Sequence, residues 1–424
     1  MDRDSVADVL NRSCHCISVD RDALKVSLEQ RFGETGVWAR LQESHPHLFA
    51  DTPVFVSPDQ ISEMRAIIDA VERVVAARAY RERVLAWVPG IARHDQGTNG
   101  VFFGYDFHLT NSGPRLIEIN TNAGGAMLLL HIAGAQQACC DAVENVIVGR
   151  TDFAGVERTF VEMFRREFHA VAPGRTLKRI AIVDENPDDQ FLGPEFTLFQ
   201  QLFARHEIDA VVAAPEHLAM EGGVLRIDNR RVDLVYSRLT DFYLQSDACR
   251  ALRKAYRRNA VAVTPGPFGH ALYANKRNLT LLSDRDWLLD LGVDENTVAI
   301  LESGIPTTWR VTRESADTLW AQRKELFFKP CWGFGSRGAY KGAKLTRKTW
   351  ERILDADYVA QKLVPPSERL VVAHGDERSL KTDVRCYTFG GEIQLLGARL
   401  YRGQTTNLRT EGGGLAAVFT TPSF

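Results

Sequence analysis

The sequence predicts an α/β protein, with α+β character towards its two ends and a small parallel α/β unit between them. Short apolar segments alternate with amphipathic helical segments from residue 177 to residue 265, as in a parallel sheet. Helical periodicity dominates the first ninety residues. Two long segments near the C-terminus, 381–389 and 392–402, meet at Gly390-Gly391 and predict an antiparallel pair of strands.

The composition is that of an ordinary folded protein and excludes several classes. The chain has 424 residues, of which 45% are hydrophobic and 25% charged, and this fits two or three packed units. A formal net charge of -2 gives no bulk attraction to nucleic acid or to an anionic membrane. The chain has no apolar run that could span a bilayer and no secretory signal, so we expect a cytoplasmic protein. Seven cysteines, an odd number, argue against a disulfide framework.

Residues 1–172 are expected to contain a helical region followed by a pair of strands within about 100–125. Apolar residues at three- and four-residue spacing predict a helix over 58–88. Strands are expected at 100–109 and 115–120, joined by a turn that contains Gly113. Two buried helices are predicted to follow, over 126–148 and 153–171.

Residues 173–268 form the predicted small parallel α/β domain, which the family resemblance given below assigns to the substrate side. Its expected strands are 178–185, 208–214, 232–238 and 260–265, and its expected helices are 193–206 and 247–258. The first strand is not followed by GxGxxG, which argues against a dinucleotide site there.

Residues 269–424 are predicted to form a nucleotide-binding region. Helices are expected at 273–290 and 345–354, with strands at 326–329 and 358–363 before the C-terminal pair.

Glu118 and Asn120 stand two residues apart on an expected strand, so they point to the same face. A carboxylate beside an amide oxygen suits a hard cation such as Mg2+, usually next to a substrate's phosphates. On another strand Asp383 and Arg385 also share a face, which would supply a carboxylate for the metal and a guanidinium for phosphate. An intrastrand salt bridge on a solvated face explains this second pair equally well.

Lys329 ends an apolar strand and precedes a glycine-rich loop. Glycines let backbone amides approach phosphate oxygens, while a lysine on the preceding strand can reach the same phosphates. The alternative for such a loop is a mobile β-turn. Lys276 could likewise be an exposed lysine at the start of a helix. The phosphate-binding candidates are Lys276, Lys329, Gly333, Gly335, Ser336, Arg337 and Gly338.

Two further segments complete the pattern. The expected strand 358–363, which includes Gln361, Lys362 and Leu363, leads to a stiff bend. Its backbone groups could pair with adenine, and the alternative is an ordinary core strand. Arginines Arg399 and Arg409 run into three glycines, Gly412, Gly413 and Gly414, which suggests an anion pocket closed by a flexible loop. A basic surface strand ending in a hairpin would have the same sequence.

Together these residues resemble the ATP-grasp enzymes, of the circularly permuted kind that includes eukaryotic-type glutathione synthetase. IEINT is similar to their metal-binding Glu-x-Asn strand, and FFKP-x-x-G-x-G-S-R-G resembles their lysine strand and phosphate loop. YVAQ is similar to the adenine-facing connector, DVR to the second metal-and-phosphate strand, and RTEGGG to the loop that shields the intermediate. Glu118 precedes Asp383 by about 260 residues, whereas the order is reversed in unpermuted families.

The resemblance implies an ATP- and Mg2+-dependent carboxylate–amine ligase that forms an amide through an acyl phosphate. Mg2+ would be held by Asp383, Glu118 and Asn120. Arg385, Arg399, Arg409 and the loop Gly412–Gly414 would act on the transferred phosphate, the substrate carboxylate and the intermediate. The partners would be a small acid and an amine or short peptide, and a homodimer is left open. Because a cysteine- or glycine-recognition pattern is missing, glutathione is not assumed as the product.

Two rival functions share this ATP site. A kinase would phosphorylate a hydroxyl without forming an amide, and a non-catalytic nucleotide-binding partner protein would bind ATP without turnover.

Overall fold

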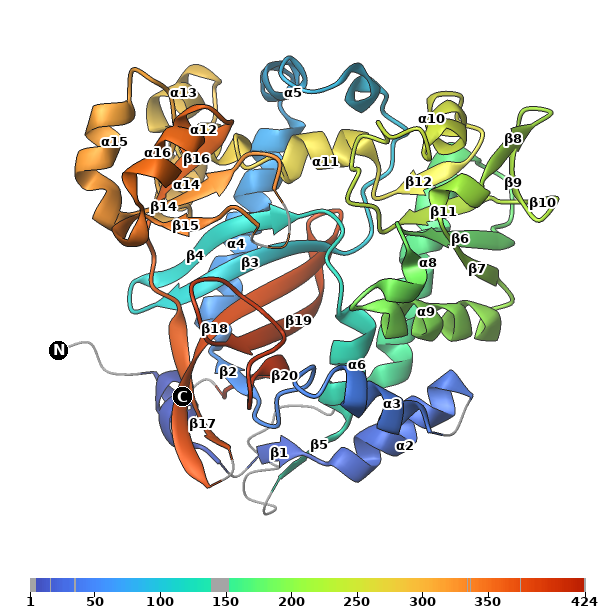
Figure 1. The fold of residues 1–424 in the computed structure, drawn as a ribbon, viewed down its shortest axis with the longest axis horizontal. Helices are drawn as coiled ribbons and strands as arrows, with labels where there is room; N and C mark the ends of the chain where they lie inside the picture. The colour runs from blue at the N-terminus through green and yellow to red at the C-terminus, as the bar shows by residue number, and fades with distance from the viewer. Residues whose placement is uncertain are drawn as a thin grey trace.

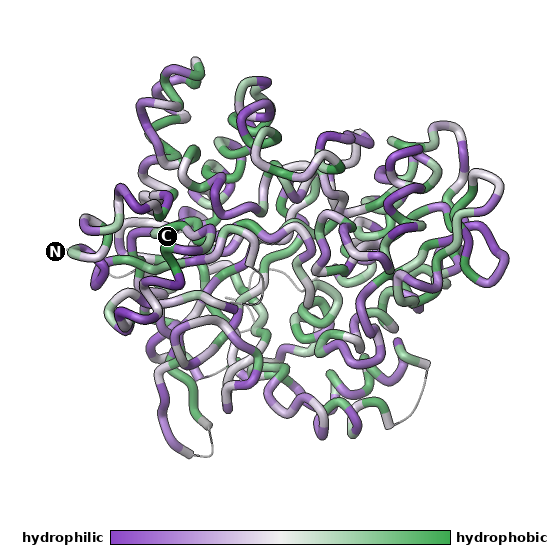
Figure 2. Tube along the Cα trace, turned by 45° about the horizontal axis from the view of Figure 1, so that its top comes forward, coloured by the Kyte–Doolittle hydropathy of each residue, from purple (hydrophilic) through white to green (hydrophobic). Residues whose placement is uncertain are grey.

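The computed structural model describes residues 5–15, 17–33, 36–138, 152–333, 335, 337–373 and 375–422. Within these ranges the strands form five sheets, with helices around them (Figure 1). Three sheets position the candidate site: a seven-stranded sheet, a four-stranded antiparallel sheet and a four-stranded parallel sheet. In Figure 2 the hydrophilic stretches are prominent on the outer loops, whereas hydrophobic stretches fill much of the interior. Across the described residues, each helix is too short or too polar to cross a membrane.

The seven-stranded sheet is built from both ends of the chain. Its order is β2-β20-β19-β18-β3-β4, and β17 pairs with β18. The N-terminal third supplies β2 (Val54–Val56), β3 (Phe103–Thr110) and β4 (Gly113–Asn120). The last sixth supplies β17 (Ser367–Ala373), β18 (Asp376–Phe389), β19 (Glu392–Tyr401) and β20 (Gly414–Thr420). Because β3 and β18 are hydrogen-bonded neighbours, segments far apart in sequence lie side by side (Figure 1).

One face of this sheet is apolar and packs on α4 (Pro58–Ala76), which begins with a capping box at Ser57. Tyr105 and Phe107 of β3 and Val384 of β18 belong to the same buried cluster as the α4 side chains. Side chains alternate along a strand, so the neighbours of these residues, Asp106 in β3 and Asp383 in β18, point to the opposite face. Asp106, Asp383 and Arg385 therefore lie on the face of the sheet that is opposite to α4.

The first ninety residues are mainly helical, as predicted. They form α1 (Val6–Ser13), α2 (Arg21–Phe32), α3 (Val37–Ser44), α4 and α5 (Arg78–Leu85). The prediction of one helix over 58–88 is wrong in one detail, because the chain turns extended at Ala77 between α4 and α5. The Val75 carbonyl there accepts a hydrogen bond from the Arg81 side chain, which replaces a helical partner.

The small parallel unit matches its prediction closely. Its sheet has the order β12-β11-β6-β7, and all three of its pairings are parallel. The strands are β6 (Arg179–Val183), β7 (Asp209–Ala213), β11 (Leu234–Ser237) and β12 (Ala262–Thr264). The helices are α8 (Phe153–Val171), α9 (Gly193–Arg205) and α10 (Arg250–Arg257). A small antiparallel sheet that was not predicted follows β7, formed by β8 (Ala219–Glu221), β9 (Val224–Ile227) and β10 (Arg230–Arg231).

The antiparallel sheet of four strands has the order β13-β16-β14-β15. Its strands are β13 (Thr308–Arg310), β14 (Leu326–Pro330), β15 (Tyr340–Lys341) and β16 (Tyr358–Lys362). The helices α15 (Ala316–Gln322) and α16 (Arg347–Leu354) share a buried cluster with this sheet (Figure 1). The preceding helix α14 (Glu295–Gly304) packs on α4 and β4 instead. Phe328 packs edge-on against Trp350 of α16, which fixes that helix on the sheet.

Two predicted helices are wrong. The helix expected over 126–148 ends early: α6 (Ala126–Gly134) is followed by β5 (Gln136–Ala138), whose backbone pairs with β1 (Ile17–Val19). Residues 139–151 of that prediction lie outside the described residues.

The helix expected over 273–290 is divided into α12 (Asn278–Leu282) and α13 (Arg285–Asp290), which follow α11 (Pro267–Tyr273). Polar side chains cause the breaks, because Asn and Asp compete with the helical backbone for its hydrogen bonds. Asn275 accepts from the Arg277 amide, and Asn278 donates to two carbonyls of α11. Asp284 caps α13.

Arg369 of β17 provides a test of how the N-terminal segment is anchored. Its guanidinium is fully buried and donates to the carbonyls of Asn11, Cys14 and Pro53. Arg369→Met would leave these acceptors without a donor, so we expect the free energy of unfolding to fall by about 3 kcal/mol. Chemical denaturation would measure this, with Arg230→Met, at an exposed surface ion pair, as a control that changes little. Equal effects of the two substitutions would contradict the anchoring role.

Candidate nucleotide and substrate site

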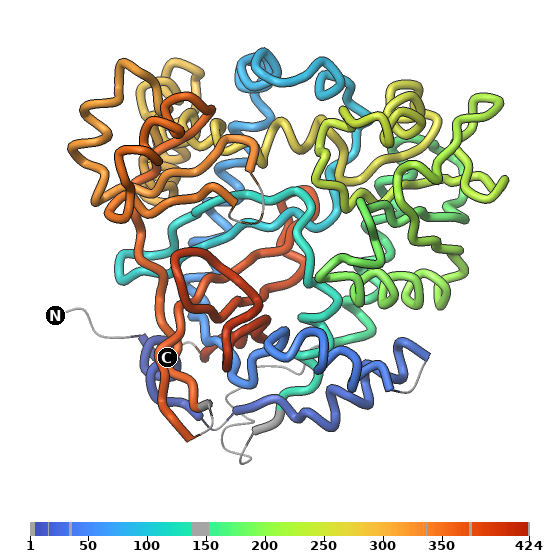
Figure 3. Tube along the Cα trace, in the orientation of Figure 1, coloured from blue at the N-terminus to red at the C-terminus, as the bar shows by residue number. Residues whose placement is uncertain are grey.

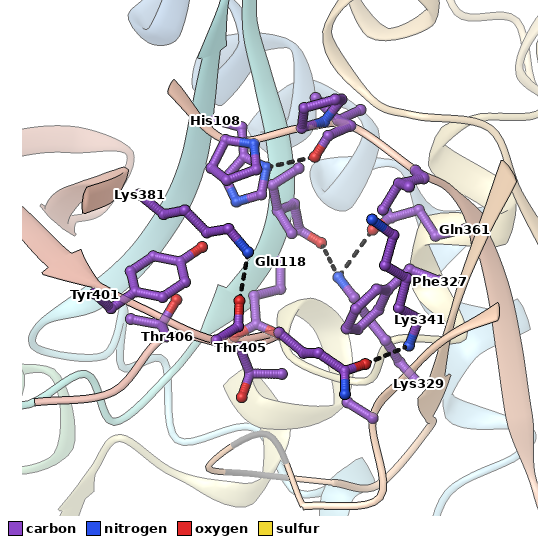
Figure 4. A pocket seen from close by; sticks show the side chains of 18 of the residues that line it. His108, Glu118, Phe327, Lys329, Lys341, Gln361, Lys381, Tyr401, Thr405 and Thr406 are labelled. Atoms are coloured by element: carbon purple, nitrogen blue, oxygen red, sulfur yellow. Dashed lines mark hydrogen bonds between the residues drawn. The ribbon is translucent and has the colours of Figure 1, made fainter. Parts of the chain in front are cut away.

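A cleft of about 440 Å3 lies between the antiparallel sheet and the charged face of the seven-stranded sheet. This volume is in the range of small-molecule sites. Both sheets contribute side chains to it, as Figure 4 shows. The large sheet supplies His108, Ile117, Glu118, Asn120, Lys381 and Tyr401, and the antiparallel sheet supplies Phe327, Lys329, Lys341, Gln361 and Lys362.

A β-bulge in β4 connects the two sheets. Glu118 pairs with Asp106 and Leu116 with Phe107, so Ile117 is the extra residue between them. The Ile117 carbonyl accepts a hydrogen bond of 2.9 Å from the Lys329 ammonium, which also donates to Gln361 at 2.8 Å. Lys329 is thereby fixed at the wall of the cleft with its charge beside the Glu118 strand (Figure 4).

Glu118, Asn120 and Lys276 meet at one end of the cleft. The Lys276 ammonium lies 3.6 Å from the Glu118 carboxylate and donates to the Gly333 carbonyl at 2.9 Å. The Asn120 amide nitrogen donates to Glu118 at 3.2 Å and to Asp106 at 3.0 Å. Because nitrogen is the donor in both bonds, the amide oxygen is the atom that can coordinate a cation. The pair predicted from its i, i+2 spacing therefore does share one face.

Asp106 is the centre of a buried charge network on the same sheet face. Arg385 donates to both of its oxygens, at 2.6 and 2.7 Å, and Arg399 approaches one of them at 2.8 Å. Arg399 also bonds Asp383 at 2.6 Å, and Thr406 donates to the other Asp383 oxygen. Arg385, Arg399 and Asp383 are thus brought together beside the cleft rather than lining it.

The pKa values of Glu118 and Lys329 in the cleft are shifted by burial and by each other's charge. Burial opposes ionisation of Glu118, yet Lys276 and Lys329 hold the pKa of this carboxyl below its ordinary value. Burial lowers the pKa of Lys329 to about 8, although Glu118 raises it. Glu118 is therefore an anion at neutral pH, whereas Lys329 is a cation that can lose its proton in mild alkali.

The glycine-rich loop lies at the same end of the cleft. Gly333, Gly335 and Arg337 line the cleft, and the Gly338 carbonyl accepts a hydrogen bond of 2.9 Å from the Tyr358 hydroxyl. The backbone φ angles of Gly335 and Gly338 are positive, a conformation that glycine adopts easily because it has no Cβ. Ser336, a predicted phosphate ligand, lies outside the described residues.

The predicted adenine strand runs along the cleft from Gln361, whose side chain accepts a hydrogen bond from Lys329, towards Leu363 at the other end. Gln361, Lys362 and Leu363 all line the cleft. The backbone amides of Lys362 and Leu363, however, donate to the carbonyls of Thr307 and Glu325. They are therefore engaged within the protein, and carbonyl or side-chain groups of this segment are the ones that can meet a base.

The loop between β19 and β20 crosses in front of the large sheet (Figure 3). Gln404 accepts from the Lys341 amide, and the Arg409 guanidinium lies 5.4 Å from the Phe191 ring centroid of the small parallel unit. Gly412, Gly413 and Gly414 do not line the cleft. Gly413 and Gly414 are buried, and a Cβ at these positions would lie 2.3 Å from the Leu400 carbonyl and 2.5 Å from the His47 carbonyl. In this structure they permit close backbone packing.

Several residues at the site were not predicted. Lys341, Lys344 and the segment Gly403–Thr406 line the cleft, although they carry no motif. Lys381 precedes Asp383 by two residues and shares its alternation, so the strand pattern could have identified it. Arg238 follows β11, at the carboxyl edge of the parallel sheet where ligands commonly bind.

Arg238 is buried against the turn that follows Glu118 and Asn120. A Cβ on Gly124 would lie 2.7 Å from the Arg238 guanidinium, so only glycine permits this approach. The Arg238 Nε is buried without a hydrogen-bond partner among the described residues. Such an orphaned donor is a candidate anchor for an anionic ligand.

The residues present fit a magnesium ion held together with phosphates. Across the described parts of the chain, no three His, Cys, Asp or Glu side chains form a cluster that could hold a metal alone. Mg2+ commonly uses one or two carboxylates plus substrate phosphates and water. Glu118 and Asn120 supply oxygen ligands of this kind beside Lys276 and Lys329.

Comparison with known proteins assigns the fold. No protein-family model and no curated protein sequence matches the chain. The structure of a glutathione synthetase-like effector from Globodera pallida aligns with a TM-score of 0.55 at 10% identity, over 95% of this chain and 98% of that chain. The chain therefore has a glutathione synthetase-like fold, and the predicted ATP-grasp fold class is confirmed. The circular permutation stays a prediction.

Two other solved structures align with lower TM-scores. A putative γ-glutamylcysteine synthetase from Methylobacillus flagellatus aligns with a TM-score of 0.47 and 11% identity, over 84% of each chain. D-cycloserine synthetase aligns with a TM-score of 0.27 and 14% identity, over 55% of this chain and 92% of that chain. At such identities a likeness describes the fold alone, so function is argued from the site.

Gly414 tests whether the glycine run is a packing device. Its φ is 115°, and an alanine Cβ would lie 2.5 Å from the His47 carbonyl, so Gly414→Ala should destabilise the fold by at least about 3 kcal/mol. Gly403 has a similar φ of 111° but no atom within 4 Å of its Cβ position, so Gly403→Ala should cost only about 1–2 kcal/mol. Thermal unfolding compares the two, and an equal loss would argue against tight packing at Gly414.

Lys329 gives a pH signature. Its ammonium is protonated below about pH 8 and loses its charge as pH rises through that value. The affinity for ATP, measured by calorimetry without turnover, should therefore be full at pH 7 and fall about tenfold by pH 9. In Lys329→Arg the guanidinium stays charged, so this decline should flatten. A decline of the same size in both proteins would assign the titration to another group.

Proposed function

We propose that the protein is an ATP- and Mg2+-dependent carboxylate–amine ligase. The observation that carries this proposal is the convergence of Lys276 and Lys329 on Glu118 and Asn120 inside one cleft. Two fixed cations beside a carboxylate and an amide oxygen suit a nucleotide's phosphates and their metal. The glutathione synthetase-like fold supports a ligase over other ATP-using reactions, and the cytoplasm is the expected location.

The chain's own residues would supply positioning and charge. Lys276, Lys329 and the amides of the glycine-rich loop bind the ATP phosphates, and Gln361–Leu363 border the base. Glu118 and Asn120, with Asp383 as a third predicted ligand, would hold Mg2+, which offsets phosphate charge when bound. Arg385 and Arg399 balance the carboxylates of Asp106 and Asp383 on the same sheet face, so this network holds the face together without adding net charge.

The acid substrate would sit between the cleft and the small parallel unit. Its carboxylate oxygen attacks the γ-phosphorus, ADP leaves, and an acyl phosphate forms. The amine nitrogen then attacks the acyl carbon, phosphate leaves, the nitrogen loses a proton, and an amide remains. The Arg238 guanidinium, whose Nε has no partner among the described residues, is the proposed anchor for a second anionic group of the acid. Arg409 and the loop around it would limit the entry of water, which otherwise hydrolyses the acyl phosphate.

ADP-release screening across amino acids, short peptides and polyamines, with mass detection of the condensed product, tests the proposal. We expect ADP formation that requires both an acid and an amine. Amine-independent ADP with a phosphorylated product would indicate the kinase, and ATP binding without any turnover would indicate the non-catalytic partner protein.

Single substitutions assign the roles. Lys329→Ala should lower turnover by at least about 100-fold because it removes a fixed charge from the transferred phosphate. Glu118→Gln should raise the Mg2+ concentration needed for half-maximal rate. Lys348→Ala, at an exposed position of α16 outside the cleft, is the matched control. Wild-type kinetics in the first two variants would contradict the assigned roles.

A further inference from the structure

The cleft has two chemically different ends. Their positions follow from the register between strands β14 and β16. Lys329 pairs with Val359, whereas Leu326, three residues earlier, pairs with Lys362. At about 3.3 Å per residue these two levels lie about 10 Å apart. Glu118, Lys276 and the glycine-rich loop gather at the Lys329 level. The segment 362–366 lies at the other level, which is called the far end below.

Four lysines line the far end of the cleft. Lys341 belongs to β15 and pairs with Phe327, and Lys344 ends the short 3-10 helix Gly342–Lys344 that follows. Lys362 comes from β16, and Lys381 projects from the large sheet on the opposite wall (Figure 4). None of Lys341, Lys344 and Lys362 forms an ion pair with a described residue.

One acidic side chain, Glu368, lines the cleft near these lysines. It faces Lys381 across the β17–β18 pair, but its carboxylate also accepts a hydrogen bond of 2.5 Å from Ser379. Four lysines and one carboxylate therefore line this part of the cleft, so the carboxylate does not balance the positive charge.

The proposed nucleotide does not explain these charges. With its phosphates at Lys276 and Lys329, its base and sugar occupy the far end, and both are uncharged. Several unpaired cations around an uncharged group do not stabilise a fold, because like charges that line one cleft repel each other. The imbalance indicates an anionic group at this position.

We infer that the far end of the cleft is a second anion-binding site, which takes a phosphate group other than the 5′-phosphates of the nucleotide. The inference rests on the proposed function, because it uses the orientation of the nucleotide. The group has two sources of the same chemistry: a phosphate on the ribose of the nucleotide, or the phosphate of a separate phosphorylated substrate. In either case Lys341, Lys344 and Lys381 would donate charge-assisted hydrogen bonds to its oxygens.

Matched nucleotides test the first source. AMP, adenosine 2′,5′-bisphosphate and adenosine 3′,5′-bisphosphate differ by one ribose phosphate, and calorimetry gives their dissociation constants on the full chain. We expect one bisphosphate to bind about tenfold more tightly than AMP, with a gain that shrinks as salt increases. For the second source, inorganic phosphate is titrated into protein saturated with AMP, and binding there would show that a separate anion uses the site.

Two variants and a control assign the effect. Lys344→Gln and Lys341→Gln should remove the gain from the extra phosphate while the affinity for AMP stays unchanged. Lys344 is exposed, so its substitution does not disturb the core. Lys348→Gln, outside the cleft, should change neither affinity.

Three results would overturn the inference, and they are distinguishable. If both bisphosphates bind like AMP and phosphate does not bind to the saturated protein, the far end takes no anion. If Lys344→Gln weakens AMP as much as a bisphosphate, these lysines hold the nucleotide's own phosphates. If wild-type protein binds neither ATP nor AMP, the proposed function fails and the inference fails with it.

Discussion

The site depends on the pairing of strand β3 with strand β18. The Asp106–Arg385 ion pair joins these two strands. The two residues are direct partners in the register, and the guanidinium bonds both carboxylate oxygens. Because Asp106 also accepts from Asn120, the same carboxylate orients the candidate metal ligand. A contact between the two ends of the chain thus decides where the cleft chemistry lies.

Burying so many charges is unfavourable unless they compensate one another. Burial opposes ionisation of Asp106, but Arg385 and Arg399 hold its pKa below the ordinary value. At the cleft, Glu118 and Lys276 compensate each other in the same way at 3.6 Å. The difference is that the Asp106 network is closed by arginines, whereas the ammonium groups of Lys276 and Lys329 border open space. The first arrangement supports the sheet, and the second is available to a ligand.

Local patterns predicted what depends on near neighbours in sequence. The i, i+2 spacing placed Glu118 beside Asn120, and strand alternation placed Asp383 and Arg385 on one face, because strand geometry fixes both. The bulge at Ile117 could not be predicted, since it is defined only by the partner strand. The same holds for Arg238 and Lys344, whose importance comes from what the fold places opposite them. The glycines at 412–414 were recognised, but the backbone of His47 that packs on them is remote in sequence.

Asp383 shows how the structure refines a predicted ligand set. Glu118 and Asn120 border the cleft, whereas Asp383 has only 3% of its surface exposed and bonds Arg399 and Thr406. A carboxylate can accept two hydrogen bonds and still coordinate a cation, but the guanidinium beside it repels that cation. Since Mg2+ is commonly held by one or two protein oxygens plus phosphates, the proposed site needs only Glu118 and Asn120 as protein ligands. Asp383 would join them only if Thr406, and with it the segment Gly403–Thr406, moved away from the carboxylate.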